Sequence, residues 1–510
     1  MNQNAGAVET SRGGILTLTG QQWLIVFMVQ LSNMLFNMTI TLANLVLPQM
    51  RGTLSATQDE ISWVITLNLV ATAIATPMTA WLAGRLGWRK MMLATVGGFT
   101  VASLLCGLAT SLETLILARV MQGAFGAPIA PLGQAILLAT FPRHLQPFAL
   151  VMWGVGSVFG PVVGPILGAM ATEAWNWRAA FFMIVPPGIA TLICIWFALK
   201  EHTAATTLRL DWIGFLALAI ALVCAQLVFD RGQRMDWFDS PEIVMCTVVG
   251  ILAFWVFVVH CLTSTEPFLD PRILLNRNFA VGTTIAFVIG MLSFTSLVLF
   301  PTLLHDLRGY PEDVISVLIA ARGLGNWTAF LFITQLTRIA PRFAIGAGLA
   351  IQAAAGFWMS QFDINVTHSA VFWSHYLMGL GNSVAFTPMT VMAFSTLPKE
   401  KITEGAAVFT MMRNFGSSLF ISLSVLVLIR TSSISYAELS EFVTVYRPVF
   451  SDPSFPTIWN PETTDGLMRL SREVQRQAAM IGYINAFYMM TAVATVSVPL
   501  AICLRKISYR

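Results

Sequence analysis

Residues 154–168 read GVGSVFGPVVGPILG and stand inside a long apolar run. Four glycines recur at every fourth position and therefore share one face of a helix: Gly156, Gly160, Gly164 and Gly168. A face without side chains lets a neighbouring helix approach closely. Pro161 and Pro165 each remove a backbone donor and bend the helix. We expect either ordinary small-residue packing or a bent seam along which two packed parts move, and two prolines in register favour the seam.

The composition indicates a membrane protein. Hydrophobic residues make up 56% of the chain and charged residues 11%, whereas about a quarter of a soluble domain is charged. About fourteen apolar stretches are long enough to cross a bilayer as helices. These predicted spans are Trp23–Leu47, Ile61–Ala83, Met91–Ala109, Thr114–Phe141, Phe148–Ala171, Ala180–Leu199, Trp212–Phe229, Ile243–Leu262, Ala280–Leu304, Val314–Leu336, Phe343–Met359, Ala370–Leu397, Ala406–Ile429 and Tyr483–Leu504.

Lysine and arginine gather in alternate loops, as in the turn that holds Arg85, Arg89 and Lys90. The positive-inside rule then places both termini in the cytoplasm, and the net charge of +4 reflects this bias rather than a nucleic-acid partner. The tail before the first span lacks the features of a cleaved signal peptide. The expected organisation is a cytoplasmic tail (1–21), an N-terminal six-helix bundle (22–199), an inserted helix pair with flanking loops (200–279), a C-terminal six-helix bundle (280–504) with a periplasmic loop at 430–480, and a cytoplasmic tail (505–510).

Two basic turns indicate a weak internal repeat. Gly84–Lys90 joins the second and third spans, and Arg338–Arg342 joins the tenth and eleventh. If the seventh and eighth spans are an insertion, the chain divides into two six-helix halves. Repeated halves around a central site are typical of secondary transporters.

Enzyme chemistry finds little support in the residues. All six cysteines lie in or beside apolar spans, so neither a disulfide framework nor a metal site is predicted. A membrane enzyme would need a nucleophile, a metal cluster or paired carboxylates, and the chain shows no HExxH motif, phosphate loop or clustered His/Asp pairs. We expect neither an enzyme nor a bound cofactor.

Several motifs, in order along the chain, resemble the major facilitator superfamily and, within it, the fourteen-span drug:proton antiporters of the EmrB/QacA type. The glycine–proline stretch is similar to the antiporter motif of that family, and Leu117–Gly123 to its fourth-helix motif. Leu82–Lys90 resembles the basic loop, Ala43–Pro48 the end of the first-helix motif, and residues 230–238 the insert. The resemblance implies the major facilitator fold: two six-helix bundles plus two inserted helices.

The resemblance also implies functional parts. Arg119 is similar to a family arginine that supports the first helix and the proton step. The family's first helix carries an embedded aspartate where this chain has Thr39, and Gly84 is followed by Arg85 where an acid is expected. A threonine does not carry a proton at physiological pH. A periplasmic adaptor and an outer-membrane channel are implied partners.

Charged residues inside spans are functional candidates because they are costly in a bilayer. Arg119, Arg322 and Arg413 fall inside or near the middle of spans, and no Asp or Glu falls clearly mid-span. Their alternative role is structural bonding to carbonyls. Cations without a resident acid would favour anionic cargo, held through its carboxylate or phosphate.

Uncharged polar residues add further candidates. Asn33, Asn37 and Thr41 share a face of the first helix, and that face either lines a cavity or holds helices together. Other candidates for substrate binding, on the fourth, tenth and twelfth spans, are Gln122, Asn326, Trp327, His375 and Asn382. His375 could titrate near neutral pH, although a membrane histidine is more often a packing residue.

These observations predict a secondary-active exporter that moves amphipathic small molecules, multidrug or metabolite, out of the cytoplasm or the inner leaflet by alternating access. An uncoupled facilitator or an importer of the same fold is the alternative. With Thr39 in place of the acid, the titratable candidates for coupling are Asp230, Glu404 and His375. The glycine stripe with its prolines, together with Arg85 and Arg89, is expected to serve gating. The expected location is the bacterial inner membrane, with membrane lipid as a further partner.

Overall fold

The computed structural model describes residues 18–142, 145–200, 210–265, 267–443, 459 and 463–505, and all the long regular elements among them are α-helices. The first seventeen residues and the last five, which belong to the predicted tails, lie outside the described residues, as do 444–458 and 460–462 of the predicted periplasmic loop. Thirteen helical segments of the described part are long and apolar enough to cross a membrane.

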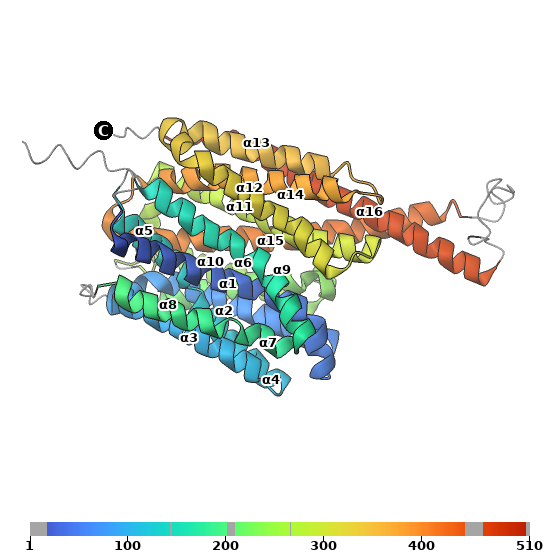
Figure 1. The fold of residues 1–510 in the computed structure, drawn as a ribbon, viewed down its shortest axis with the longest axis horizontal. Coiled ribbons are helices and arrows are strands. Elements are labelled where there is room, and N and C mark those ends of the chain that lie inside the picture. Colours follow the sequence, from blue (N-terminus) through green and yellow to red (C-terminus); the bar gives the residue numbers. More distant parts are fainter. Residues whose placement is uncertain are drawn as a thin grey trace, which may run out of the picture. The chain divides into compact units, whose positions relative to one another are not determined.

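The chain separates into two compact units. The N-terminal unit comprises Met1–Leu210 and Leu397–Ala407; the C-terminal unit comprises Asp211–Thr396 and Val408–Arg510. The predicted inserted pair therefore groups with the C-terminal helices. Figure 1 labels the helices of both units.

Eight helices form the N-terminal unit. They are α1 (Gly20–Thr53), α2 (Gln58–Leu86), α3 (Trp88–Leu108), α4 (Leu112–Gly126), α5 (Ile129–Thr140), α6 (Gln146–Ala174), α7 (Trp177–Phe182) and α8 (Val185–Ala198). α4 with α5 forms one span, and α7 with α8 another, so these eight helices make six spans. α1 packs along α6, and α2 packs along α4.

The C-terminal unit begins with α9 (Trp212–Arg231) and α10 (Pro241–Thr263), the inserted pair. Short turns η3 (Gly232–Met235) and η4 (Trp237–Asp239) join them. The remaining elements are η5 (Pro271–Leu275), α11 (Arg277–Thr302), the π-helical η6 (Leu303–Leu307), α12 (Glu312–Ile339), α13 (Pro341–Met359), α14 (His368–Phe394), α15 (Ile402–Ser440), α16 (Thr464–Ser497) and α17 (Leu500–Cys503). The short turn η7 (Lys399–Lys401) precedes α15, and it groups with the N-terminal unit together with residues 402–407 of α15. α14 lies between α12 and α13 and packs closely on both.

α13 explains the difference between the thirteen apolar segments and the fourteen predicted spans. It is 19 residues long and coincides with predicted span Phe343–Met359. It begins with Pro341 and Arg342 and contains Gln352, and it is not among the thirteen segments. A helix of about 20 residues is nevertheless long enough to cross the hydrocarbon core.

α15 and α16 extend beyond the predicted spans. They are 39 and 34 residues long, whereas about 20 residues cross a bilayer. The polar ends of the two helices meet where Tyr436 Oη lies 2.9 Å from Ser471 Oγ. Much of the predicted loop 430–480 is therefore helical, and the ends of α15 and α16 form a helical hairpin.

Candidate functional site

The predicted glycine stripe lies on α6 and packs against the backbone of α1. A Cβ added at Gly156 would fall 2.4 Å from the carbonyl oxygen of Gln30, and one at Gly160 would fall 2.5 Å from that of Met34. Further along α6, a Cβ added at Gly164 would fall 2.6 Å from Thr41 Oγ1, and one added at Gly168 would fall 3.2 Å from Leu45 Cδ2. Both prolines, Pro161 and Pro165, lie inside the continuous helix α6. The two helices approach so closely because these positions lack side chains.

On the polar face of α1, Asn33 bonds to α6, whereas the bonds of Asn37 and Thr41 stay within α1. Asn33 is fully buried, and its Nδ2 donates to the carbonyl oxygen of Trp153 at 3.2 Å and to Ser157 Oγ at 2.5 Å. Asn37 Nδ2 donates to the carbonyl oxygen of Asn33 at 2.8 Å. Thr41 Oγ1 donates to the carbonyl oxygen of Met38. Asn33 therefore joins α1 to α6.

Thr39 occupies the position of the expected acid. Its side chain is buried, and Oγ1 donates to the carbonyl oxygen of Leu35 at 2.8 Å, one turn earlier on α1. This bond satisfies the hydroxyl within its own helix, a common arrangement for threonine in an apolar setting.

Arg119 and Gln122 form a buried cluster between α2, α3 and α4. Arg119 Nε donates to the carbonyl oxygen of Val64 at 3.3 Å, and Nη1 donates to Gln122 Oε1. Gln122 Nε2 in turn donates to Ser103 Oγ at 2.7 Å. Both predicted residues are 1% exposed. The guanidinium is thus held by neutral oxygens.

A ring of hydrogen bonds surrounds Arg322 in the C-terminal unit. Arg322 Nη1 donates to the carbonyl oxygen of Ser293 at 2.5 Å and to Ser296 Oγ at 2.9 Å. Asn326 Nδ2 donates back to the carbonyl oxygen of Arg322 at 2.8 Å. Asn326 Oδ1 accepts from Asn382 Nδ2 at 3.3 Å, and Ser293 Oγ donates to Asn382 Oδ1 at 2.7 Å. α11, α12 and α14 are joined by this ring, which unites three predicted residues: Arg322, Asn326 and Asn382.

Arg322 is 4% exposed, and within the described residues no acidic side chain forms an ion pair with it. An uncompensated cation in a low-dielectric environment strongly attracts an anion. The ring therefore leaves Arg322 suited to an anionic ligand.

The other predicted residues of this unit make contacts of their own. His375 is fully buried against Phe300, with ring centroids 4.3 Å apart, and its Nδ1 lies 3.1 Å from the carbonyl oxygen of Val371. The guanidinium of Arg413 lies 5.8 Å from the ring of Phe386. Trp327 is 50% exposed, so it is not enclosed with its neighbour Asn326.

The predicted coupling and gating residues occupy helix ends. Asp230 is exposed near the end of α9. Glu404 Oε2 lies 3.2 Å from Lys401 Nζ at the start of α15. Arg85 stacks over Trp81 at 5.3 Å, and Arg89 stacks over Trp196 at 4.6 Å.

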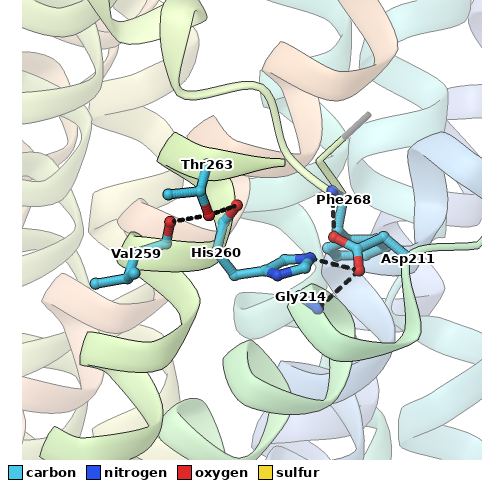
Figure 2. Close-up of polar contacts among 6 residues, drawn as sticks. All are labelled: Asp211, Gly214, Val259, His260, Thr263 and Phe268. Carbon is cyan, nitrogen blue, oxygen red and sulfur yellow. Dashed lines mark hydrogen bonds and ion pairs between the residues drawn. The ribbon is translucent and has the colours of Figure 1, made fainter. Parts of the chain in front are cut away.

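Asp211 forms a junction that the sequence did not indicate. Its Oδ1 accepts from the backbone N–H of Gly214 at 3.0 Å and lies 2.9 Å from His260 Nε2, while Oδ2 accepts from the backbone N–H of Phe268 at 3.0 Å (Figure 2). Burial alone would raise the pKa of this carboxyl. The bonds from Gly214, Phe268 and His260 outweigh burial and hold the pKa below its usual range.

Other contributors were also missed. Ser293, Ser296 and Ser383 complete the ring around Arg322, and Asn68 Nδ2 donates to the carbonyl oxygen of Arg119 at 2.8 Å. A signal existed for the first two, because serines three apart share a helix face. Serine in a span is otherwise common small-residue packing, so this signal is weak.

A chain of membrane-crossing helices with polar clusters buried inside each unit defines an integral membrane transporter. Residues 27–421 match the family model described as Major Facilitator Superfamily. The chain belongs to this superfamily, and it is a transporter rather than an enzyme.

Curated relatives narrow the comparison. The chain is 30% identical to the Multidrug export protein EmrB of Escherichia coli (strain K12), over 84% of this chain and 85% of that protein. It is 30% identical to EmrB of Haemophilus influenzae, over 94% and 93%. It is also 30% identical to the Fatty acid resistance protein FarB of Neisseria gonorrhoeae, over 80% of each. The family and these relatives make the chain an efflux transporter of small molecules.

Solved structures support the fold. A bacterial homologue of the human lysosomal transporter Spinster, in an inward-facing and unoccupied conformation, matches with a TM-score of 0.57 at 14% identity, covering 96% of this chain and 99% of that one. The human organic anion transporter MFSD10 (TETRAN) matches with a TM-score of 0.57 at 12% identity, covering 93% and 99%.

Proposed function

We propose that the protein exports amphipathic, preferentially anionic small molecules from the cytoplasm or the inner leaflet by alternating access, driven by the proton gradient. The single observation that carries the anionic preference is the buried Arg322, whose hydrogen bonds go to Ser293 and Ser296. A guanidinium offers two parallel donors to a carboxylate, sulfonate or phosphate. The name of the FarB relative, a fatty acid resistance protein, supports an acidic amphipath as cargo.

Substrate binding is assigned to buried polar residues of both units. Arg322, Asn326 and Asn382 already share one ring, and His375 and Arg413 stand on the neighbouring stretches of α14 and α15. In the N-terminal unit the candidates are Gln122, Asn33, Asn37 and Thr41. Trp327 is the weakest candidate, because half of its surface is exposed.

Gating is assigned to the seam between α1 and α6. The glycines of α6 let it lie directly on the backbone of α1, and Pro161 and Pro165 free carbonyls that allow the helix to bend. Arg119 supports the adjoining cluster, Arg85 stacks on Trp81 of its own helix α2, and Arg89 fastens the start of α3 to α8 by stacking on Trp196.

Thr39 does not titrate at physiological pH, so proton coupling needs a titratable group elsewhere. Glu404, Asp230 and His375 are the proposed carriers. Glu404 is favoured by geometry, because its side chain is only 15% exposed and forms an ion pair with Lys401. Protonation of Glu404 would break this ion pair. The alternative is an uncoupled facilitator or an importer of the same fold.

The proposed orientation places both termini in the cytoplasm of a bacterial cell, because basic residues gather on that side. The hairpin of α15 and α16 then projects into the periplasm. A periplasmic adaptor and an outer-membrane channel are the proposed partners that would complete the export path.

Charge selectivity tests this proposal in proteoliposomes. Radiolabelled taurocholate serves as a permanently anionic amphipath and ethidium as a permanently cationic one. Arg322→Gln is expected to lower taurocholate transport by tenfold or more, since about 1.5–3 kcal/mol is typical for a hydrogen bond to a charged group, and to leave ethidium transport within twofold. Arg469→Gln, which removes an exposed guanidinium on α16, is the matched control. Equal loss of both probes would refute the anionic site.

A further inference from the structure

Asp211 links three segments of the C-terminal unit that are far apart in the sequence. It is the N-cap of α9, it bonds to His260 in the last turn of α10, and it accepts from the backbone of Phe268 in the connector that leads to α11. Figure 2 shows these contacts converging on one carboxylate. The connector is fastened further by Phe268, whose ring meets that of Phe215 at 5.4 Å.

α10 depends on such specific contacts. Most of its large apolar side chains are exposed, and only 6% of its apolar segment is buried within the protein. Lipid tails are as apolar as these side chains, so hydrophobic burial does little to hold one membrane helix on another. Close packing and polar bonds must do so. Among the described contacts to α9, Gly250 packs on Cys224, Arg231 lies 3.9 Å from Glu242, and His260 bonds to Asp211.

α9 in turn packs on α15. Gln226 Oε1 accepts from Ser418 Oγ at 3.0 Å, and the carbonyl oxygen of Phe229 accepts from Ser422 Oγ at 2.7 Å. The ring of Phe415 on α15 lies 5.4 Å from that of Phe229 on α9 and 6.4 Å from that of Phe287 on α11. α15 therefore contacts both α9 of the inserted pair and α11.

This placement matters because α15 carries Arg413. The backbone of Arg413 lies directly on Gly290 of α11, where an added Cβ would fall 2.0 Å from the carbonyl oxygen of Arg413. A shift of α9 that moved α15 would therefore change the contact between Arg413 and Gly290.

We propose that Asp211 is a positioning residue for transport: its carboxylate joins α9, α10 and the α11 connector into a brace that keeps α15 and Arg413 against α11. The inserted pair then moves with the C-terminal unit throughout the transport cycle. This inference rests on the proposed transport function, but the brace itself is a statement about the C-terminal unit alone.

Three variants of the full-length protein test the brace. Asp211→Asn removes the charge and leaves one oxygen to accept bonds, His260→Leu removes only the α10 bond, and His260→Gln retains a donor. Asp363→Asn is the matched control, because Asp363 caps its own loop through the backbone N–H of Asn365 at 2.9 Å. Hydrogen exchange of the purified protein and the kinetics of taurocholate and ethidium transport in proteoliposomes are measured for each.

Asp211→Asn is expected to accelerate exchange in 264–276 and in the first turn of α9, and to lower the maximal rate for both probes about tenfold with KM within twofold. His260→Leu should show a smaller loss of the same kind, His260→Gln should restore most of the rate, and Asp211→Asn with His260→Leu should be no slower than Asp211→Asn alone. An unchanged maximal rate, or faster exchange without a slower rate, would overturn the proposal. If the wild-type protein carries neither probe, the transport function fails, while the exchange data still decide whether Asp211 holds the brace.

Discussion

Gly160 on α6 lies against the carbonyl oxygen of Met34 on α1, so closely that an added Cβ would be 2.5 Å from that oxygen. No carbon atom can remain at that distance from an oxygen to which it is not bonded. The contact therefore requires glycine at position 160. It also means that α6 carries no side chain at the points where its glycines meet α1.

Gly160→Ala is expected to lower the thermal stability of the purified protein and its transport rate together. Overpacking of this kind costs about 1–3 kcal/mol, because the two backbones must move apart. Gly154→Ala on the same helix is the control, since nothing lies within 4 Å of its added Cβ. Equal melting temperatures for the two variants would contradict the seam.

Asn326→Leu is expected to weaken the C-terminal unit. It leaves the carbonyl oxygen of Arg322, the amide of Asn382 and the hydroxyl of Ser383 without their shared partner. Each unsatisfied buried group costs about 1–3 kcal/mol. Thermal unfolding in detergent measures the loss, with exposed Asn365→Leu as the control, and a variant as stable as the wild type would show that the ring adds nothing.

Arg119→Lys is expected to lose most transport despite its retained charge. The guanidinium reaches the carbonyl oxygen of Val64 through Nε and Gln122 through Nη1, and a single ammonium cannot reproduce this planar fork. Arg469→Lys, in an exposed pair with Asp465 on α16, should transport normally. Wild-type rates for Arg119→Lys would mean that charge alone suffices.

The stabilising effect of Asp211 is expected to be present at neutral pH and to be lost only in strong acid. Its pKa is held below the usual range, so the carboxylate is fully ionised above about pH 5. A group with a lowered pKa in the folded state contributes stability above its ordinary pKa and loses it as the pH falls through the folded value. The difference in melting temperature between wild type and Asp211→Asn should therefore persist from pH 8 to pH 5 and shrink in stronger acid. A difference that vanishes already at pH 6 would assign the effect to another group.

The apolar runs and the glycine spacing were sufficient to predict the membrane helices and the bare face of α6, since both are local patterns. The same patterns could not reveal the partners of Asn33, because Trp153 and Ser157 lie more than a hundred positions away in the sequence. Asp211 and His260 stand 49 positions apart, and nothing in either local sequence indicates the other. The hairpin of α15 and α16 was predicted as a loop because polar residues outside a membrane continue a helix as readily as they leave it.

The central claim is that the proton gradient drives export of the cargo, and transport into everted membrane vesicles tests it most directly. Radiolabelled taurocholate should accumulate above its equilibrium level when the lumen is made acidic, and the accumulation should collapse when a protonophore abolishes the pH gradient. Flux that ignores the gradient and stops at equal concentrations on both sides would contradict proton-driven export and identify an uncoupled facilitator.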